Sequence, residues 1–245
     1  MSSTNPSPAA SLGLPPAPAL AARAVRAVRA SGGRPARRTR RAACIAWAAL
    51  LGASCLVACA PQPAPAAHGL DISGANYGLD FHLADPQGRE RSLADFRGKV
   101  VLLFFGFVQC PDVCPAALAR AAEVMRLLDD DGSKVQTLFV TLDPERDAPA
   151  TLQAYTAAFH PSFIGLRGDL LRTKETANHF KIDYRKVPTA GSYTIEHTAI
   201  TFAFDPAGRL RLALPPSLSA RDAAQDVAAL LQGAAGAGAG SAPSR

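Results

Sequence analysis

Apolar and polar positions follow two different periods in the first half of the segment 70–231. Two runs, 99–107 and 135–143, are largely apolar, which is the pattern of strands covered on both faces of a sheet. Each run is followed by apolar side chains at helical spacing, from Pro115 onward and over 147–159. The order strand, helix, strand, helix predicts an α/β layer structure.

The second half adds a helix, a hairpin and a closing helix. Helical spacing recurs over 169–180, and 197–214 predicts two strands joined by a turn at 205–208. A short amphipathic helix is predicted over 222–231, and an earlier hairpin and turn over 79–99. This order of elements predicts a thioredoxin-like α/β fold, in which helices flank a central mixed sheet that carries an extra hairpin.

Two helix starts can be predicted from proline and aspartate. Pro115 suits the first position of a helix, where its missing N–H had no partner. Asp147, two residues before Pro149, is predicted to be the N-cap of the next helix, with tuning of a functional site or contact with a partner as the alternative. Asp143 precedes a proline at a strand end and has two interpretations, a turn residue or an accessory carboxylate near a functional site.

The first 59 residues have the plan of a membrane-targeting leader. Residues 1–41 carry eight arginines and no acid, and residues 42–58 are uncharged and mostly apolar, as in a secretory signal. The run ends in Leu-Val-Ala-Cys, which resembles a bacterial lipoprotein signal with Cys59 as the lipidated residue. An uncleaved membrane helix is the alternative. Either anchor predicts a domain on the bacterial cell envelope, facing the periplasm or another extracytoplasmic space.

The chain is therefore predicted to have four parts. The leader 1–59 is followed by a Pro/Ala-rich tether over 60–69, the thioredoxin-like domain over 70–231 and a low-complexity tail, predicted disordered, over 232–245. Without the eight arginines of the leader, the formal net charge falls from +6 to −2. Binding to nucleic acid, which needs a basic patch on the folded part, is not expected.

Only two of the five cysteines belong to the predicted domain. Cys110 and Cys114 follow the first apolar run and precede a helix, at the sheet edge where open α/β proteins place their ligands and chemistry. The N–H groups and the dipole of the helix N-terminus favour thiolate there. A domain of this size buries its own core without a disulfide framework, so a redox couple and a metal site are the two main alternatives.

The spacing of the cysteines and one histidine favour a metal. Three residues separate Cys110 from Cys114, one more than in redox thioredoxins, so both sulfurs can face one external point and suit a soft ion such as Cu(I). A thiol oxidoreductase also needs a cis-proline opposite the cysteines, but Ala199 occupies the corresponding position and Pro188 lies too far back. His197 lies close to that position, which makes it the candidate third ligand.

Four segments of the domain resemble the Sco (SenC) family of copper chaperones. They are "GKVVLLFFGFVQCPDVCPAAL", "VTLDPERDAP", "FIGLRGD" and "YTIEHTAITFAFDPAGR", and in order and spacing the similarity covers about residues 69–231. The resemblance implies a membrane-tethered thioredoxin fold that binds one copper through Cys110, Cys114 and His197. It also implies a role in building the binuclear copper site of cytochrome c oxidase subunit II.

One departure from the family pattern lies beside the first cysteine. Val108 and Gln109 stand where many members have a threonine followed by an aromatic residue or a histidine. The three implied ligands are unaffected.

The sequence favours a metallochaperone over an enzyme. Cys110, Cys114 and His197 would take up Cu(I) or Cu(II) and pass the ion to thiolates of subunit II by ligand exchange. The alternative is a thiol–disulfide reductase that keeps the cysteines of that partner reduced, since copper loading requires reduced thiols. Either role needs a further partner, a thiol reductant protein or a copper donor. A redox or copper sensor is a remote third hypothesis, because the sequence offers no effector surface for it.

Overall fold

The computed structural model describes residues 67–238. The predicted leader with Cys59, most of the tether and residues 239–245 lie outside the described part, so the lipid or helix anchor stays a prediction. No helix within residues 67–238 is both long enough and apolar enough to cross a membrane. The strands are β1 Leu70–Asp71, β2 Leu83–Ala84, β3 Glu90–Arg91, β4 Val100–Gly106, β5 Val135–Thr141, β6 Ile164–Leu166, β7 Tyr184–Thr189, β8 Ser192–His197, β9 Thr201–Phe204 and β10 Leu210–Leu214. The helices are α2 Val113–Leu127, α3 Pro149–Ala157, α4 Leu170–His179 and α5 Ala220–Gly238, with short 3-10 helices at Leu93–Phe96 and Asp129–Lys134.

A six-stranded mixed sheet forms the centre of the domain, as the sequence predicted. Its strand order is β1-β10-β9-β4-β5-β6. The apolar strand β4 pairs in parallel with β5 and antiparallel with β9. All seven residues of β4 and all seven of β5 are buried, which explains why both runs lack the alternation of a half-exposed strand.

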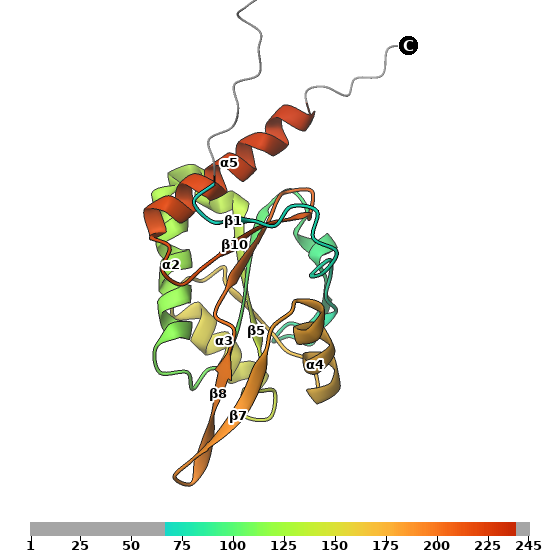
Figure 1. Cartoon of the computed structure of the whole chain (residues 1–245), viewed down its shortest axis with the longest axis vertical. Helices are drawn as coiled ribbons and strands as arrows, with labels where there is room; N and C mark the ends of the chain where they lie inside the picture. The colour runs from blue at the N-terminus through green and yellow to red at the C-terminus, as the bar shows by residue number, and fades with distance from the viewer. Residues whose placement is uncertain (1–66, 239–245) are drawn as a thin grey trace, which may run out of the picture. The chain divides into compact units, whose positions relative to one another are not determined.

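Helices cover both faces of this sheet. Figure 1 shows α2 and α3 on one side and α4 on the other. Neighbouring residues of a strand point to opposite faces. Phe104 accordingly packs on Phe139, which contacts Tyr155 of α3, whereas Phe105 packs on Phe180 at the end of α4. The core therefore has two layers, one on each side of β4.

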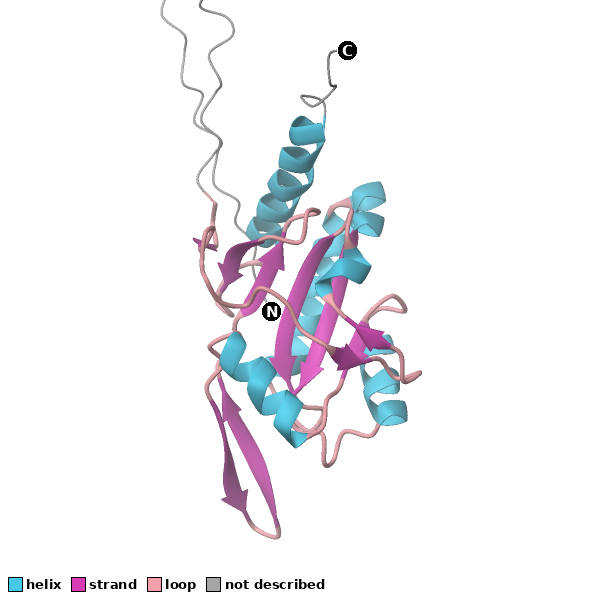
Figure 2. Cartoon of the chain, turned by 90° about the vertical axis from the view of Figure 1, so that its right-hand side faces the viewer, coloured by secondary structure: helices cyan, strands magenta, loops and turns pink. Residues whose placement is uncertain are grey.

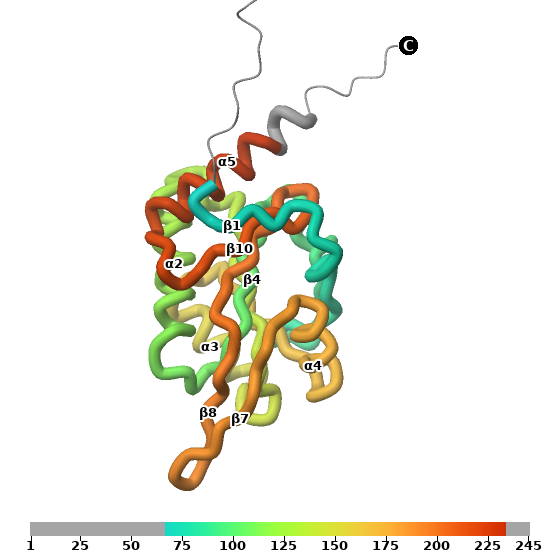
Figure 3. The backbone as a smooth tube through the Cα atoms, viewed as in Figure 1, coloured from blue at the N-terminus to red at the C-terminus, as the bar shows by residue number. Residues whose placement is uncertain are grey.

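A second hairpin, β7–β8, was not predicted from the sequence. It forms a two-stranded sheet of its own and extends away from the main sheet (Figures 2 and 3). Its strands are mostly exposed or half-buried and contain Pro188, so they lack the apolar runs that indicate buried strands. The turn at its tip uses Gly191 with a φ of 79°, a conformation that side chains other than glycine rarely adopt. This hairpin carries His197 at its base.

The predicted turn at 205–208 is confirmed and depends on a buried carboxylate. Asp205 accepts hydrogen bonds from the N–H groups of Ala207 and Arg209 at 3.0 Å each, and from Nε of Arg209 at 2.8 Å. It lies at the end of β9 that pairs with the beginning of β4, and the cysteines follow the other end of β4. Asp205 therefore stabilises the hairpin remote from the cysteines.

Several predicted boundaries were wrong. Helix α2 begins at Val113, so Pro115 is the third helical residue and Cys114 lies inside the first turn. His197 does not begin the strand of the 197–214 hairpin; it ends β8, and β9 begins at Thr201. Helix α5 runs to Gly238, beyond the predicted end at Leu231. The observed boundaries thus place Cys114 in the first turn of α2 and His197 at the end of β8, and side chains at such element ends can converge.

Candidate metal centre

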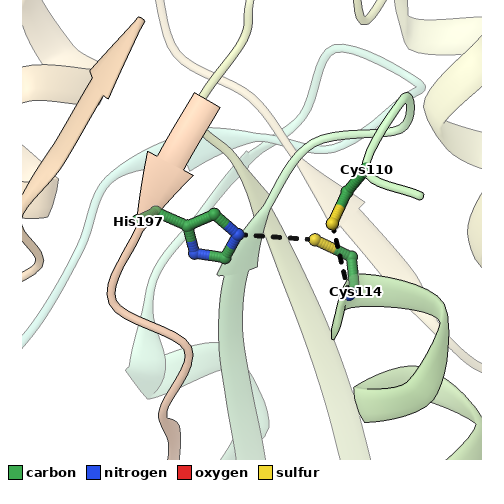
Figure 4. Close-up of side chains that lie close together, drawn as sticks. All are labelled: Cys110, Cys114 and His197. Atoms are coloured by element: carbon green, nitrogen blue, oxygen red, sulfur yellow. Dashed lines mark hydrogen bonds between the residues drawn. The ribbon is translucent and has the colours of Figure 1, made fainter. Parts of the chain in front are cut away.

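Cys110, Cys114 and His197 meet at one point (Figure 4). The two Sγ atoms and a ring nitrogen of His197 all lie within 4.8 Å of one another, and Sγ of Cys114 lies 3.5 Å from Nε2 of His197. Both cysteines are free thiols. The three residues come from the loop after β4, the first turn of α2 and the last residue of β8. The structure thus brings together the three side chains that the sequence singled out.

Backbone hydrogen bonds hold the cysteine loop. The N–H of Cys110 donates to the carbonyl of Phe107 at 3.2 Å, which closes the turn after β4. The N–H of Cys114 donates to Sγ of Cys110 at 3.4 Å. An N–H group at a helix N-terminus directed at sulfur stabilises the thiolate form. The predicted position of the pair, at the carboxyl end of a central strand, is confirmed.

Gly106 makes room for Cys114, a requirement that the sequence analysis missed. A Cβ atom at Gly106 would lie 2.7 Å from Sγ of Cys114 and 2.9 Å from Cε2 of Phe139. Both distances are below normal van der Waals contact, so any larger residue would displace the sulfur or the ring. A glycine directly before the loop of a reactive cysteine pair is the only signal that could have indicated this.

The imidazole of His197 is oriented by its second nitrogen. Nδ1 lies 3.0 Å from the carbonyl oxygen of Thr198, and because a carbonyl only accepts hydrogen bonds, Nδ1 carries the proton of this bond. In the neutral ring this leaves the lone pair of Nε2 directed at Cys114. Phe104 and Phe107 pack edge-on to the ring with centroid distances of 6.0 and 6.1 Å. His197 is therefore presented as a metal ligand through Nε2.

The two thiols have opposite proton affinities. A hydrogen bond from the Cys114 thiol lowers the pKa of Cys110 to about 4; burial opposes this shift, and the N–H groups of Cys114 and Asp112 support it. The pKa of Cys114 is raised, first by its hydrogen bond to Cys110 and then by burial. At neutral pH the pair therefore holds one proton, on Cys114, and Cys110 is the thiolate.

The site is less open than its loop position suggested. Cys110 is 8% exposed and Cys114 is fully buried, whereas His197 is half-buried. An incoming ion or thiol can approach through Cys110 and His197 but not through Cys114. The donor set of two sulfurs and one imidazole nitrogen fits a soft transition-metal ion such as Cu(I).

Asp147 does not cap a helix, which corrects the sequence prediction. Helix α3 begins at Pro149 with Ala148 as its N-cap residue. The Asp147 carboxylate instead accepts hydrogen bonds from the N–H of Val108 at 3.1 Å and the hydroxyl of Thr141 at 2.5 Å. Desolvation in this buried position raises the pKa of Asp147. The Asp147 carboxylate is thus hydrogen-bonded to the loop that leads to Cys110.

Asp143 is connected to the other half of the site. One oxygen accepts a hydrogen bond from the hydroxyl of Tyr193 at 2.8 Å, and the other pairs with Nε of Arg146. The guanidinium of Arg146 stacks 3.7 Å above the ring of Tyr193 and donates to the carbonyl of that residue. Asp143 is not part of the group of three ligand atoms. It contacts the strand that carries His197 through Tyr193. Tyr193 belongs to the family-like Tyr-x-x-x-His pattern, but no role was assigned to it from the sequence.

The remaining described histidines lie elsewhere. Three of them have polar partners of their own, Gln225 for His68, Glu90 for His82 and Ser162 for His160, and the fourth, His179, ends α4. None belongs to the group of ligand atoms. His197 is thus the single described histidine at the cysteine pair.

The fold and the site define a mixed α/β domain with a candidate soft-metal centre of two cysteines and one histidine. A family model described as SCO1/SenC matches residues 71–232. This match covers nearly all of the described domain. The chain belongs to the SCO1/SenC family.

Relatives with known names support this membership. The chain is 39% identical to a mitochondrial SCO2 homolog of Danio rerio over 133 residues, 53% of this chain and 48% of that one. It is 34% identical to a SCO2-like protein of Rickettsia conorii over 135 residues, 54% of this chain and 66% of that one. The chain therefore spans about half to two thirds of the length of these relatives.

Solved structures share the fold. ScoI of Bradyrhizobium japonicum, described with copper bound, superposes with a TM-score of 0.57 at 36% identity, covering 65% of this chain and 99% of that one. Apo Sco1 of Thermus thermophilus superposes with a TM-score of 0.59 at 40% identity, covering 69% and 97%. Copper is thus the metal bound by a structural relative, and this chain has a Cys-Cys-His group that could hold it.

Proposed function

We propose that this protein is a copper metallochaperone of the cell envelope. In this proposal Cys110, Cys114 and His197 bind one copper ion, which the protein delivers to the binuclear copper site of cytochrome c oxidase subunit II. The observation that carries the proposal is the convergence of two sulfurs and one imidazole nitrogen within 4.8 Å. Family membership supports it, because structural relatives carry copper.

The composition of the site favours copper over zinc. Structural zinc sites use four ligands in a tetrahedron. Among the cysteine, histidine and acidic side chains of the described residues, the group that could hold a metal ion has three members, two cysteines and one histidine. Two thiolates and one imidazole suit Cu(I), which is softer than Zn(II) and accepts lower coordination numbers. Cu(II) would recruit a further ligand.

Delivery by ligand exchange follows from the chemistry of the three side chains. Cys110 is available as a thiolate at neutral pH, and binding of copper displaces the remaining proton from Cys114. A thiolate of the partner would replace one protein ligand at a time, entering on the side of Cys110 and His197. No electron is transferred in this exchange, so the oxidation state of copper is conserved.

The membrane attachment is part of the proposal. The basic and apolar leader, ending at Cys59, supports a lipid or helix anchor on the cell envelope. Such an anchor would hold the domain near a membrane-bound oxidase. A thiol reductant or a copper donor would serve as the second partner.

One observation favours a second candidate function, a thiol–disulfide reductase that acts on the cysteines of subunit II. Cys110 is a low-pKa thiolate with Cys114 hydrogen-bonded beside it, the arrangement of an attacking and a resolving thiol. Against this function stands His197, whose ring is oriented by Thr198 so that Nε2 faces the sulfurs. A reductase has no need of such a ligand, so we rank the metallochaperone first.

The test is an anaerobic Cu(I) competition titration of the reduced full chain in detergent. The leader cysteines Cys44, Cys55 and Cys59 are replaced by serine, so that copper can report only on the domain. One copper per chain is expected, with a loss of at least 100-fold in affinity for Cys110→Ala and Cys114→Ala. Unchanged affinity in either variant would reject the copper site.

A further inference from the structure

A continuous chain of hydrogen bonds connects the cysteine loop with the histidine strand. The N–H of Val108 and the hydroxyl of Thr141 both donate to Oδ2 of Asp147, at 3.1 and 2.5 Å. The oxygen of Thr141 in turn accepts the N–H of Asp143 at 2.9 Å. The hydroxyl of Tyr193 donates to Oδ1 of Asp143 at 2.8 Å. The loop 143–147 is thereby bonded to both halves of the metal centre.

The two ends of this chain are close to the ligands. Val108 precedes Cys110 by two residues in the loop after β4. Tyr193 precedes His197 by four residues on β8, and because side chains alternate along a strand, the two point to the same face. A shift at either end would therefore move a ligand relative to the others.

The middle of this hydrogen-bond chain is buried, where water cannot replace a lost partner. Thr141 and Asp143 are fully buried and Asp147 is 1% exposed. A buried carboxylate is energetically costly unless it is hydrogen-bonded. The Asp147 carboxylate accepts hydrogen bonds from the cysteine loop and from β5, not from helix α3. Loss of one hydrogen-bonding group leaves buried polar partners that water cannot satisfy, so the hydrogen-bond chain acts as a unit.

We propose that the chain Val108–Asp147–Thr141–Asp143–Tyr193 is a brace that fixes the separation of the cysteine loop from His197. Asp147, which binds the cysteine loop, and Tyr193, at the histidine end, are positioning residues, and neither belongs to the group of three ligand atoms. This inference rests on the proposed function, because its consequence is the geometry offered to copper. Partners beyond the ligands of a metal typically change affinity by about 10- to 100-fold.

The experiment is a double-mutant cycle in the full chain with serine at the three leader cysteines. Asp147→Ala removes the acceptor at the cysteine end, and Asp147→Asn keeps an acceptor oxygen without the charge. Tyr193→Phe removes the hydroxyl at the histidine end and retains the ring beneath Arg146. Asp205→Ala, a buried carboxylate at the remote turn, is the matched control for a general loss of stability.

Three readouts separate positioning from folding. Cu(I) affinity is measured by competition, and the thiolate-to-Cu(II) absorption band reports the geometry of the loaded site. The third readout is hydrogen exchange of the Val108 amide in the copper-free protein. Thermal unfolding of each variant shows whether the fold is retained.

The brace predicts that Asp147→Ala and Tyr193→Phe each weaken Cu(I) binding about tenfold and shift the absorption band. The double variant should lose less than the product of the two, since either change already releases the brace. Asp147→Asn should stay within about threefold of the parent, because its amide oxygen still accepts the two bonds. Asp205→Ala should lower thermal stability and leave copper affinity unchanged.

The decisive copper-free result is exchange of the Val108 amide in Tyr193→Phe. The hydroxyl removed lies at the opposite end of the chain, so faster exchange at Val108 supports the brace. Unchanged exchange overturns the brace, as do strictly additive losses in the double variant or an equal loss in Asp147→Asn and Asp147→Ala. A parent protein that binds no copper would reject the proposed function, while the exchange result would still decide on the brace.

Discussion

Sγ of Cys114 lies 3.5 Å from Nε2 of His197, although 83 positions separate the two residues in the chain. Their meeting depends on the β4–α2 junction on one side and on the hairpin β7–β8 on the other. The histidine nitrogen that faces the sulfur is the one without a proton in the neutral ring, since Nδ1 donates to Thr198. This relationship distinguishes a metal centre from a pair of redox cysteines, and its consequences can be measured.

Removal of the imidazole should separate the two candidate functions. In His197→Ala, copper affinity is expected to fall by at least 100-fold, because two thiolates alone complete no trigonal site. Reduction of a small-molecule disulfide by Cys110 should change by less than about threefold, since the hydrogen bond from Cys114 dominates its low pKa. The copper affinity and the rate of disulfide reduction are measured on the same reduced protein. Equal losses in copper binding and disulfide reduction would argue for a single redox role of the histidine.

The low pKa of Cys110 predicts an unusual pH dependence of its alkylation. The thiolate is the reactive form, so an ordinary thiol near pKa 8.5 slows about tenfold for each pH unit below that value. Cys110, with its pKa lowered to about 4, should react with iodoacetamide at a nearly constant rate from pH 8 to pH 5 and slow only as pH approaches 4. Fragmentation of the peptide that contains residues 110–114, followed by mass spectrometry, shows whether Cys110 or Cys114 is alkylated.

Cys114→Ala supplies the control for this profile. The hydrogen bond that contributes most to the shift is then absent, so the pKa of Cys110 should rise and its rate should fall between pH 8 and pH 5. A flat profile in both proteins would mean that Cys114 does not set the pKa. A profile with an apparent pKa near 8.5 in the parent would contradict the electrostatics of the pair.

Gly106→Ala should damage the site through crowding. The new methyl group would lie 2.7 Å from Sγ of Cys114, and overpacking of this kind costs about 1–3 kcal/mol. We expect a lower unfolding midpoint together with weaker copper binding, because the sulfur is displaced. Gly233→Ala is the control, since a methyl group there meets no atom within 4 Å and a helical alanine is favoured by about 1 kcal/mol. Wild-type copper affinity in Gly106→Ala would show that the sulfur does not need this space.

Phe180→Ala should affect stability without affecting the metal centre. Phe180 is fully buried and contacts the rings of Phe105 and Phe202, with centroids 5.2 and 5.5 Å away, on the sheet face that carries α4. Truncation of a buried phenylalanine costs about 3–5 kcal/mol. Denaturant unfolding should show this loss, while the folded variant binds copper as the parent does. A parallel loss of copper affinity in the folded protein would mean that the two core layers are coupled.

The ligands could be predicted from the sequence because each has a local signal. Cys110 and Cys114 stand at the end of an apolar strand, and His197 stands two residues before Ala199, the position where a redox protein would need a proline opposite them. The mixed sheet was likewise predictable from continuous apolar runs such as 99–107. The strands of the hairpin β7–β8 were not, because their side chains are largely exposed and no apolar period indicates them.

The supporting residues were harder to predict because their roles depend on tertiary contacts. Asp147, two residues before a proline, has the local pattern of a helix N-cap, but a donor 39 positions earlier, the N–H of Val108, competes for its carboxylate. Tyr193 acquires its role only when β8 folds next to Asp143. Local sequence patterns hold no information on such long-range partners.

In the proposed site, one copper ion is held by Cys110, Cys114 and His197 together. Copper K-edge X-ray absorption of the Cu(I)-loaded chain with serine at the leader cysteines tests it directly. A site of two cysteines and one histidine should show two sulfur scatterers and one imidazole nitrogen per copper, with the nitrogen contribution lost in His197→Ala. A spectrum with a single sulfur, or one that His197→Ala leaves unchanged, would contradict it.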